Sequence, residues 1–214
     1  MKSKKKSVLS FLISIMPTSR LRVFLYGKLF GYRIHKSTLG WGTIILIRKA
    51  DLNGCWIGRN NKFVGPMSLT IKQGVTIGRG NTFKCGWWTV DEKFNLAQYD
   101  RRLLIGTGAL ITSNHYFDVA GSFVLGDGSW IAGYGSQFWT HGAGASERNI
   151  FIGQNCYIGS AVRFAPGSAI GNNTLVGLGS ILTQKFSDEN VLLGGQPAKI
   201  LKKDYCWRTQ KNEK

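Results

Sequence analysis

The chain has 214 residues, enough for one domain with a buried core, and its 28 Lys and Arg against 11 Asp and Glu give a formal net charge of +17. A content of 43% hydrophobic residues excludes a disordered polycation. The four cysteines form no CxxC pair, which argues against a zinc knuckle and favours reduced thiols in the cytoplasm. The charge suggests nucleic acid, but no RNA-binding or helix-turn-helix pattern supports that partner, and we expect none.

Residues 1-40 predict a basic amphipathic helical segment. Lys4, Lys5 and Lys6 precede an apolar stretch that ends at Pro17, and a second amphipathic helix is expected to reach Gly31. Neither is as long as the roughly 18 apolar residues of a membrane span. Basic residues beside an apolar face suit peripheral contact with the anionic inner face of the cytoplasmic membrane. The same helices can instead cap the open end of a repeat structure, and the sequence leaves both possibilities open.

A repeat of six residues dominates the second half of the chain. From residue 152 onward an apolar residue recurs every six positions, and the residue after it is nearly always small: Ile152, Ile158, Phe164, Ile170, Val176 and Leu182. This period fits neither an α-helix nor a simple alternating strand. It predicts an all-β solenoid in which each hexad makes a short strand and a corner, and three hexads close a triangular coil. Successive coils then stack at about 4.8 Å.

Breaks in this phase mark loops, because extra residues in a solenoid must leave the coil. From Ile105 to Leu125 the chain runs one coil plus two residues, and from Leu125 to Ile152 one coil plus nine. We therefore expect a β-helix over 41-185 with loop insertions near 86-102, 112-118 and 141-150. A closing loop and a basic tail are expected over 186-214.

The segment IGQNCYIGSAVRFAPGSAIGNNTLVGLGSIL, followed by GGQPAK at Gly194–Lys199, resembles the hexapeptide-repeat acyltransferases. The resemblance covers about residues 104–202 and is strongest to the O-acetyltransferases of capsule, O-antigen and exopolysaccharide synthesis. It implies a left-handed parallel β-helix, and the handedness rests on the resemblance alone. It also implies a homotrimer that transfers the acetyl group of acetyl-CoA directly to a carbohydrate hydroxyl in surface polysaccharide biosynthesis.

Transfer of an acyl group to a hydroxyl needs a base that works near neutral pH, and histidine suits that role. His35 lies before the repeat. His141 begins the nine-residue insertion, immediately before the coil that carries Tyr157, and the resemblance implies that it is the base. His115, at the two-residue insertion one coil earlier, is the alternative.

Other side chains near these histidines are candidates for supporting roles. Glu147 in the inserted loop or Asp118 near His115 could orient the imidazole ring, or both could be ordinary loop charges. Tyr116 and Trp139 could stack on a sugar ring, although half-buried solenoid aromatics would have the same pattern.

The resemblance assigns the acetyl-CoA site to two segments and to Tyr157. The first is a small-residue turn along which the pantetheine arm runs, and the second is a loop that closes over the cofactor with Lys199 near the nucleotide phosphates. The residues are Gly177, Leu178, Gly179, Ser180, Gly195, Pro197, Ala198 and Lys199. The basic tail beyond Lys199, which includes Arg208, Lys211 and Lys214, could also meet these phosphates.

Three alternatives remain, one of them within the acyltransferases. Some hexapeptide-repeat proteins are carbonic anhydrases with three zinc-ligand histidines. Here the two histidines of the repeat are 26 residues apart and no third is available, so we expect no metal. The enzyme could instead N-acetylate an amino sugar or a small molecule. A non-catalytic solenoid that binds glycan or membrane would not need the GGQPAK loop, and acetyl-CoA binding distinguishes it from an enzyme.

Overall fold

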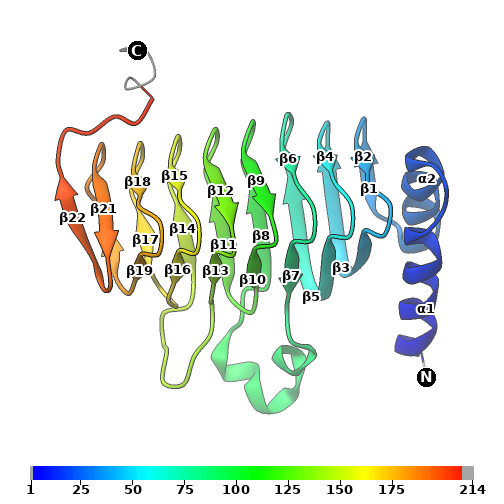
Figure 1. Ribbon diagram of the computed structural model, residues 1–214. Helices are drawn as coiled ribbons and strands as arrows, with labels where there is room; N and C mark the ends of the chain where they lie inside the picture. The colour runs from blue at the N-terminus through cyan, green and yellow to red at the C-terminus, as the bar shows by residue number, and fades with distance from the viewer. Residues whose placement is uncertain (1, 209–214) are drawn as a thin grey trace.

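The computed structural model of the protein describes residues 2–208. The hexads form short strands joined by corners, and together they wind the chain into a stack of coils (Figure 1). Tyr157 pairs with Leu175 and Ile158 with Val176, so the register between neighbouring coils is 18 residues, as the hexads predict. The strands are β1 (Arg33–His35), β2 (Thr38–Leu39), β3 (Ile44–Asn53), β4 (Trp56–Ile57), β5 (Lys62–Ile71), β6 (Thr76–Ile77), β7 (Thr82–Lys84), β8 (Arg102–Ile105), β9 (Leu110–Ser113), β10 (Tyr116–Asp118), β11 (Ser122–Leu125), β12 (Trp130–Tyr134), β13 (Gln137–Phe138), β14 (Ile150–Ile152), β15 (Tyr157–Ile158), β16 (Arg163–Phe164), β17 (Ala169–Ile170), β18 (Leu175–Val176), β19 (Ile181–Leu182), β20 (Lys185–Phe186), β21 (Leu192–Gly195) and β22 (Ala198–Lys202).

The strands form a parallel β-helix. One face is a nine-stranded sheet in the order β2-β4-β6-β9-β12-β15-β18-β21-β22. The other two faces join into one sheet because β5 runs through a corner: its first part pairs with β7 and its second part with β8. Among the described strands, only β21 and β22 pair in the antiparallel sense.

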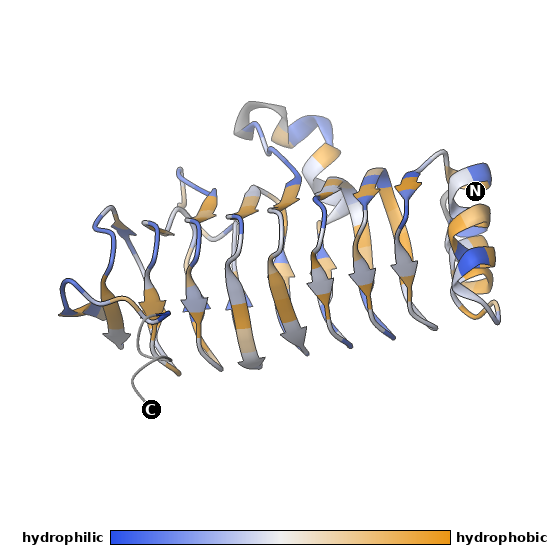
Figure 2. Ribbon diagram, turned by 90° about the horizontal axis from the view of Figure 1, so that it is seen from above, coloured by the Kyte–Doolittle hydropathy of each residue, from blue (hydrophilic) through white to orange (hydrophobic). Residues whose placement is uncertain are grey.

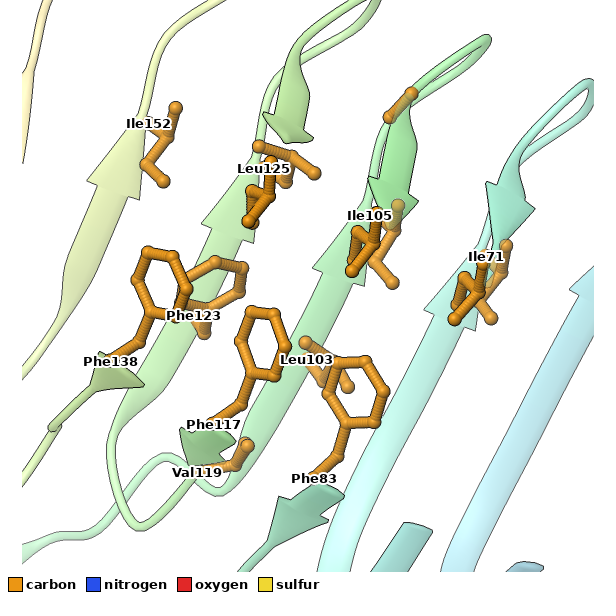
Figure 3. Close-up of a cluster of buried hydrophobic side chains, with 14 of the residues drawn as sticks. Ile71, Phe83, Leu103, Ile105, Phe117, Val119, Phe123, Leu125, Phe138 and Ile152 are labelled. Carbon is orange, nitrogen blue, oxygen red and sulfur yellow. The ribbon is translucent and has the colours of Figure 1, made fainter. Parts of the chain in front are cut away.

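Inward-facing side chains stack along the axis in continuous columns (Figure 3). One column is aromatic: the rings of Phe63, Phe83, Phe117, Phe138 and Phe164 follow one another at centroid distances of 4.5, 4.4, 4.7 and 5.1 Å. These spacings match the distance between paired strands. The core therefore consists of equivalent residues from successive coils.

Two helices, α1 (Lys2–Ser14) and α2 (Ser19–Phe30), cover the open end of the first coil. The N–H groups of Ile45 and Ile47 have no preceding coil to pair with, and they donate to the hydroxyls of Tyr26 and Tyr32, at 3.0 Å each. The buried Arg22 donates from Nε and Nη2 to the Leu39 carbonyl at 3.0 and 2.7 Å. Helix α2 and Tyr32, just beyond its end, thus supply the hydrogen bonds that another coil would have made.

Two excursions leave the coils on the same side of the solenoid (Figure 1). The first contains the short 3-10 helices η1 (Trp87–Val90) and η2 (Glu92–Ala97), between β7 and β8. The second lies between β13 and β14 and includes His141. Between β9 and β10, in contrast, the chain turns through only Asn114 and His115, with Asn114 left-handed at φ 59°.

We expect Phe117→Ala to lower the free energy of unfolding by about 3–5 kcal/mol, because the ring is fully buried between two others and its loss leaves a cavity. Urea denaturation measures the change. Phe151→Ala is the matched control, since that ring is 50% exposed and its removal should cost less than about 1 kcal/mol. Equal losses in the two variants would contradict a core built on this aromatic column.

Candidate active site

His141 lies at the corner after β13, with its side chain 38% exposed and bonded to a buried carboxylate. Its Nδ1 is 2.8 Å from Oδ2 of Asp118, whose side chain is 5% exposed. Because the Nδ1–H group donates a hydrogen bond to the carboxylate, Nε2 keeps the lone pair that a base uses. The arrangement combines an accessible imidazole with a fixed tautomer.

The carboxylate of Asp118 is itself held in place by Thr140. The backbone N–H and the hydroxyl of Thr140 both donate to Oδ2, at 3.0 and 2.7 Å, and the N–H of Gly121 donates to the Thr140 hydroxyl at 2.9 Å. Together with Nδ1 of His141, the two groups of Thr140 make three donors to Oδ2, and they hold the buried carboxylate in a fixed orientation. Asp118 therefore bonds to His141 of the next coil and not to His115, which is near it in the sequence.

The first excursion brings a tryptophan to His141 that the sequence did not indicate. The Trp88 ring meets the imidazole at 5.3 Å in an edge-on arrangement, and the same ring packs edge-on against Phe94 and Tyr99, at 5.1 Å each. The break in the six-residue pattern near residues 86–102 predicts a loop there, but the pattern does not show which corner of the solenoid that loop packs against. Trp88 shields one side of the imidazole from solvent.

His115 occupies a different environment, because it is 1% exposed. Its Nδ1 accepts from the N–H of Ser136 at 3.0 Å, and its Nε2 lies 2.9 Å from the Thr112 hydroxyl. Burial lowers the pKa of His115 to about 4. Both ring nitrogens are engaged inside the solenoid, and the structure does not bring this residue to the surface.

The same corner carries a polar side chain in four successive coils. Each of these side chains accepts a hydrogen bond from a backbone N–H group in the next coil. The acceptors are Asn61, Asn81, His115 and Ser136, and their donors are the N–H groups of Asn81, His115, Ser136 and Val162, in that order. Each precedes by two positions a phenylalanine of the aromatic column, at 63, 83, 117 and 138. The sequence holds this signal: aligned on those phenylalanines, His115 falls in a column of buried asparagines and a serine.

The structure separates the other predicted residues of this region. Glu147 is exposed and pairs with Lys185, so it does not contact His141. Tyr116 on β10 and Trp139, directly after β13, lie side by side, with centroids 4.9 Å apart and the indole 37% exposed. They form a partly open aromatic surface, Tyr116 two residues before Asp118 and Trp139 two residues before His141.

A cleft of about 430 Å³ opens between the two excursions. Its lining combines the apolar Phe151 and Ala169 with polar and charged residues: Gln98, Asp100, Ser146, Glu147, Arg148, Asn149 and Lys185, and it includes Gly121. Asn149 bridges the excursions by donating to Asp100 Oδ2 at 2.8 Å, and the guanidinium of Arg148 lies 4.7 Å from the Tyr99 ring centroid. The cleft reaches Gly121, which bonds to Thr140 beside His141.

The two predicted cofactor segments contact each other at the far end of the solenoid. Residues 194–199 form the hairpin between β21 and β22, and Gln196 in it donates to the Gly179 carbonyl at 2.7 Å. The N–H groups of Gly177 and Gly179 donate to Leu193 and Ser160, at 2.8 Å each. Leu178 between them is 81% exposed. This corner therefore presents an apolar side chain next to an open hairpin.

Within one chain the structure does not bring this corner to His141. The strands β13, β16 and β19 are parallel neighbours, with His141 just after β13 and Gly179 just before β19. The two groups thus lie at opposite edges of the same face and two coils apart.

These coils are shared with solved structures. A hexapeptide-repeat acetyltransferase of Vibrio cholerae in complex with acetyl-CoA is 21% identical, with 94% of this chain and 86% of that one covered and a TM-score of 0.50. A maltose O-acetyltransferase of Clostridium difficile 630 is 17% identical, with 94% and 85% covered and a TM-score of 0.51. These structures confirm the predicted left-handed parallel β-helix.

Local sequence matches agree with the fold. A putative lipopolysaccharide biosynthesis O-acetyltransferase and a galactoside O-acetyltransferase, both of Escherichia coli K12, are 41% identical over 54 residues and 42% over 53. Each match covers 25% of this chain, and about a quarter of the relative's length. The chain therefore shares the fold of solved hexapeptide-repeat acetyltransferases, and its local sequence matches are to O-acetyltransferases. No family model matches it.

Two further predicted elements of this hexapeptide-repeat chain lie apart from His141. Tyr157 packs against Trp207 at 5.2 Å, and Arg208 lies over the same indole at 4.8 Å, so the start of the tail folds onto the nine-stranded face. Lys211 and Lys214 lie outside the described residues. Within residues 2–208 no three His, Cys, Asp or Glu side chains are grouped to hold a metal ion.

The buried imidazole of His115 predicts acid-sensitive stability. Its pKa of about 4 in the folded chain lies below the ordinary 6.5, so the unfolded chain binds this proton first and stability falls as the pH drops below 6.5. We expect a loss of about 3 kcal/mol by pH 4 from this group alone. Urea denaturation across this range measures it.

His115→Asn is the matched variant, because asparagine fills the equivalent corner in the two preceding coils and carries no titratable proton. Its free energy of unfolding at pH 7 should be lower than that of the wild type. Between pH 6.5 and pH 4, however, that free energy should fall by about 3 kcal/mol less than it does in the wild type. An unchanged slope would show that His115 does not drive the acid sensitivity.

Proposed function

We propose that this chain is an acetyl-CoA-dependent O-acetyltransferase that acetylates a sugar hydroxyl in bacterial surface polysaccharide biosynthesis. The observation that carries the proposal is the pair formed by His141 and Asp118, in which an accessible imidazole keeps Nε2 free to accept a proton. The names of the relatives support the chemistry, since both E. coli proteins are O-acetyltransferases and one belongs to lipopolysaccharide biosynthesis.

In the proposed reaction, Nε2 of His141 takes the proton of the acceptor hydroxyl as its oxygen attacks the acetyl carbonyl. The new C–O ester bond forms, the C–S bond of the thioester breaks, and the imidazolium returns the proton to the departing thiolate. Asp118 stabilises the transient positive charge on the ring and prevents its rotation. No covalent enzyme intermediate is needed.

The surroundings of His141 suit a carbohydrate acceptor. The cleft between the excursions offers carboxylate, amide and guanidinium groups for hydroxyls, and Tyr116 with Trp139 offers an aromatic surface for a sugar ring. Acetyl-CoA is assigned to the other corner, where Leu178 can contact the pantetheine arm and the exposed Lys199 can meet phosphates.

We further infer that the active protein is a homotrimer. His141 and the cofactor corner lie at opposite edges of one face, so a site that uses both takes them from two chains. The proposed place of action is the cytoplasm, where acetyl-CoA is made, with peripheral contact at the inner face of the membrane.

To test the function, the protein is incubated with acetyl-CoA and a panel of bacterial glycans, and the new acetyl group is located by mass spectrometry. His141→Ala should lower kcat at least about 1,000-fold while acetyl-CoA binding, measured by calorimetry, stays within about twofold. A wild-type protein that binds no acetyl-CoA at millimolar concentration would exclude the proposed enzyme.

Two carboxylate variants refine this test. Asp118→Asn should reduce kcat about 100-fold, because the amide no longer fixes the imidazole tautomer. Glu147→Gln removes a carboxylate of the acceptor cleft that pairs with Lys185, so its effect should fall on the KM for the acceptor while kcat stays within about threefold of the wild type. The reverse order of effects would assign the orienting role to Glu147.

The shared site makes a second, independent prediction. His141→Ala and Lys199→Glu, the latter verified to bind no acetyl-CoA, should each be inactive alone. When the two are unfolded and refolded together in equal amounts, sites that combine an intact His141 with an intact hairpin from another chain should restore about a quarter of the wild-type activity. No recovery in mixed oligomers would place both groups of each site in the same chain.

A further inference from the structure

The outer face of the two N-terminal helices is apolar, although the end cap of a solenoid ordinarily presents a polar one. On α1, Val8, Phe11 and Leu12 are 60, 52 and 45% exposed, and on α2, Phe24 and Leu29 are 58 and 50% exposed. The inner faces of the same helices already close the first coil. Capping therefore accounts for one side of this helical pair and leaves the other unexplained.

The charge around this face has a single sign. No acidic residue occurs before Asp51, whereas the same stretch contains eleven basic residues: Lys2, Lys4, Lys5, Lys6, Arg20, Arg22, Lys28, Arg33, Lys36, Arg48 and Lys49. Lys4 and Lys5 line an apolar groove on α1 together with Val8 and Leu12. The first 50 residues thus carry +11 of the net +17.

The first excursion extends this face toward the candidate active site. A groove of about 420 Å³ runs between the helices and η1, and its lining includes Lys6, Phe30, Leu46, Arg48, Trp87 and Val90. Trp87 and Val90 are 52 and 47% exposed. Figure 1 shows the excursion and the N-terminal end of α1 projecting on the same side, and Figure 2 shows hydrophobic residues in both.

We propose that this docking surface, made by Val8, Phe11, Leu12, Phe24, Leu29 and Trp87 with the surrounding lysines, binds an anionic phospholipid bilayer. Helices with apolar side chains and a basic rim lie in the headgroup region of such membranes, and tryptophan is enriched there. The helices in the described part of the chain are too short and too polar to cross the bilayer. Binding at the surface is therefore the mode that these helices support.

Charge decides against the other occupants of this surface. A second copy of the same face would oppose lysines to lysines with no carboxylate between them. An acidic glycan would satisfy the lysines but would leave the exposed aliphatic side chains of Val8, Leu12 and Leu29 in water. An anionic bilayer satisfies both the charge and the apolar side chains, and docking through Trp87 places its neighbour Trp88, and hence His141, close to the lipid.

Flotation with vesicles tests the inference, using phosphatidylcholine alone and phosphatidylcholine mixed with phosphatidylglycerol. The full chain should float with the mixed vesicles and not with the neutral ones. Lys4→Gln with Lys5→Gln should weaken binding about 30-fold, since each basic residue near an anionic surface is worth roughly a factor of five. Lys202→Gln with Lys203→Gln, at the opposite end of the solenoid, should stay within about twofold.

The apolar part is tested separately by Phe11→Ser with Phe24→Ser, which should abolish flotation, against Tyr134→Ser, whose ring is 64% exposed in the middle of the solenoid. Unchanged thermal unfolding by circular dichroism shows that each variant is folded. A wild type that does not float with anionic vesicles would overturn the inference, as would equal losses in either control. Acetyl-CoA binding is measured on the same samples. A protein that binds acetyl-CoA but no lipid would contradict the membrane inference alone, and one that binds lipid but no acetyl-CoA would contradict the proposed function alone.

Discussion

The structure depends on the hydrogen-bonded register between coils, which is 18 residues in the uninterrupted coils. Parallel pairing places each residue beside its equivalent in the next coil, as Tyr157 beside Leu175, at the spacing of neighbouring strands. Each inward position is therefore a column that must accept the same kind of side chain throughout, and five phenylalanines satisfy one such column. The end cap, the corners and the excursions all adapt to this constraint.

The same register explains why two histidines of one chain have opposite properties. His115 stands in a column of corner residues that accept backbone N–H groups, where a neutral imidazole replaces an asparagine side chain. His141 follows the corner after β13, where the chain has left the register, and its ring is exposed. Burial in the column keeps water and a second proton away from His115. In the excursion, the partly exposed ring of His141 is oriented by the carboxylate of Asp118.

The hexad phase made the coils predictable from the sequence, and part of the site follows from it. Phe117 and Phe138 share a column, so Asp118 must lie near the start of the second excursion, although it is 23 residues from His141. Trp88 could not be found in this way. It lies in an excursion that does not follow the six-residue repeat. Its contacts with His141, Phe94 and Tyr99 depend on how the rings pack, and the pairing between coils does not determine that packing. The apolar outer face of the helices was likewise hidden, because the sequence did not show which side meets the first coil.

A stack of coils cannot bend to close over a ligand, since every coil is hydrogen-bonded to its neighbours on all faces. Groups separated by two coils and the length of a strand, as His141 and Gly179 are, keep that separation. A reaction between substrates held at these two places therefore needs either mobile loops or a second chain. The His141 side is anchored by Asp118 and Thr140, and the hairpin is tied to Gly179 by Gln196, so neither end is free to travel. The rigidity that makes the core so regular is thus a physical reason for a site shared between chains.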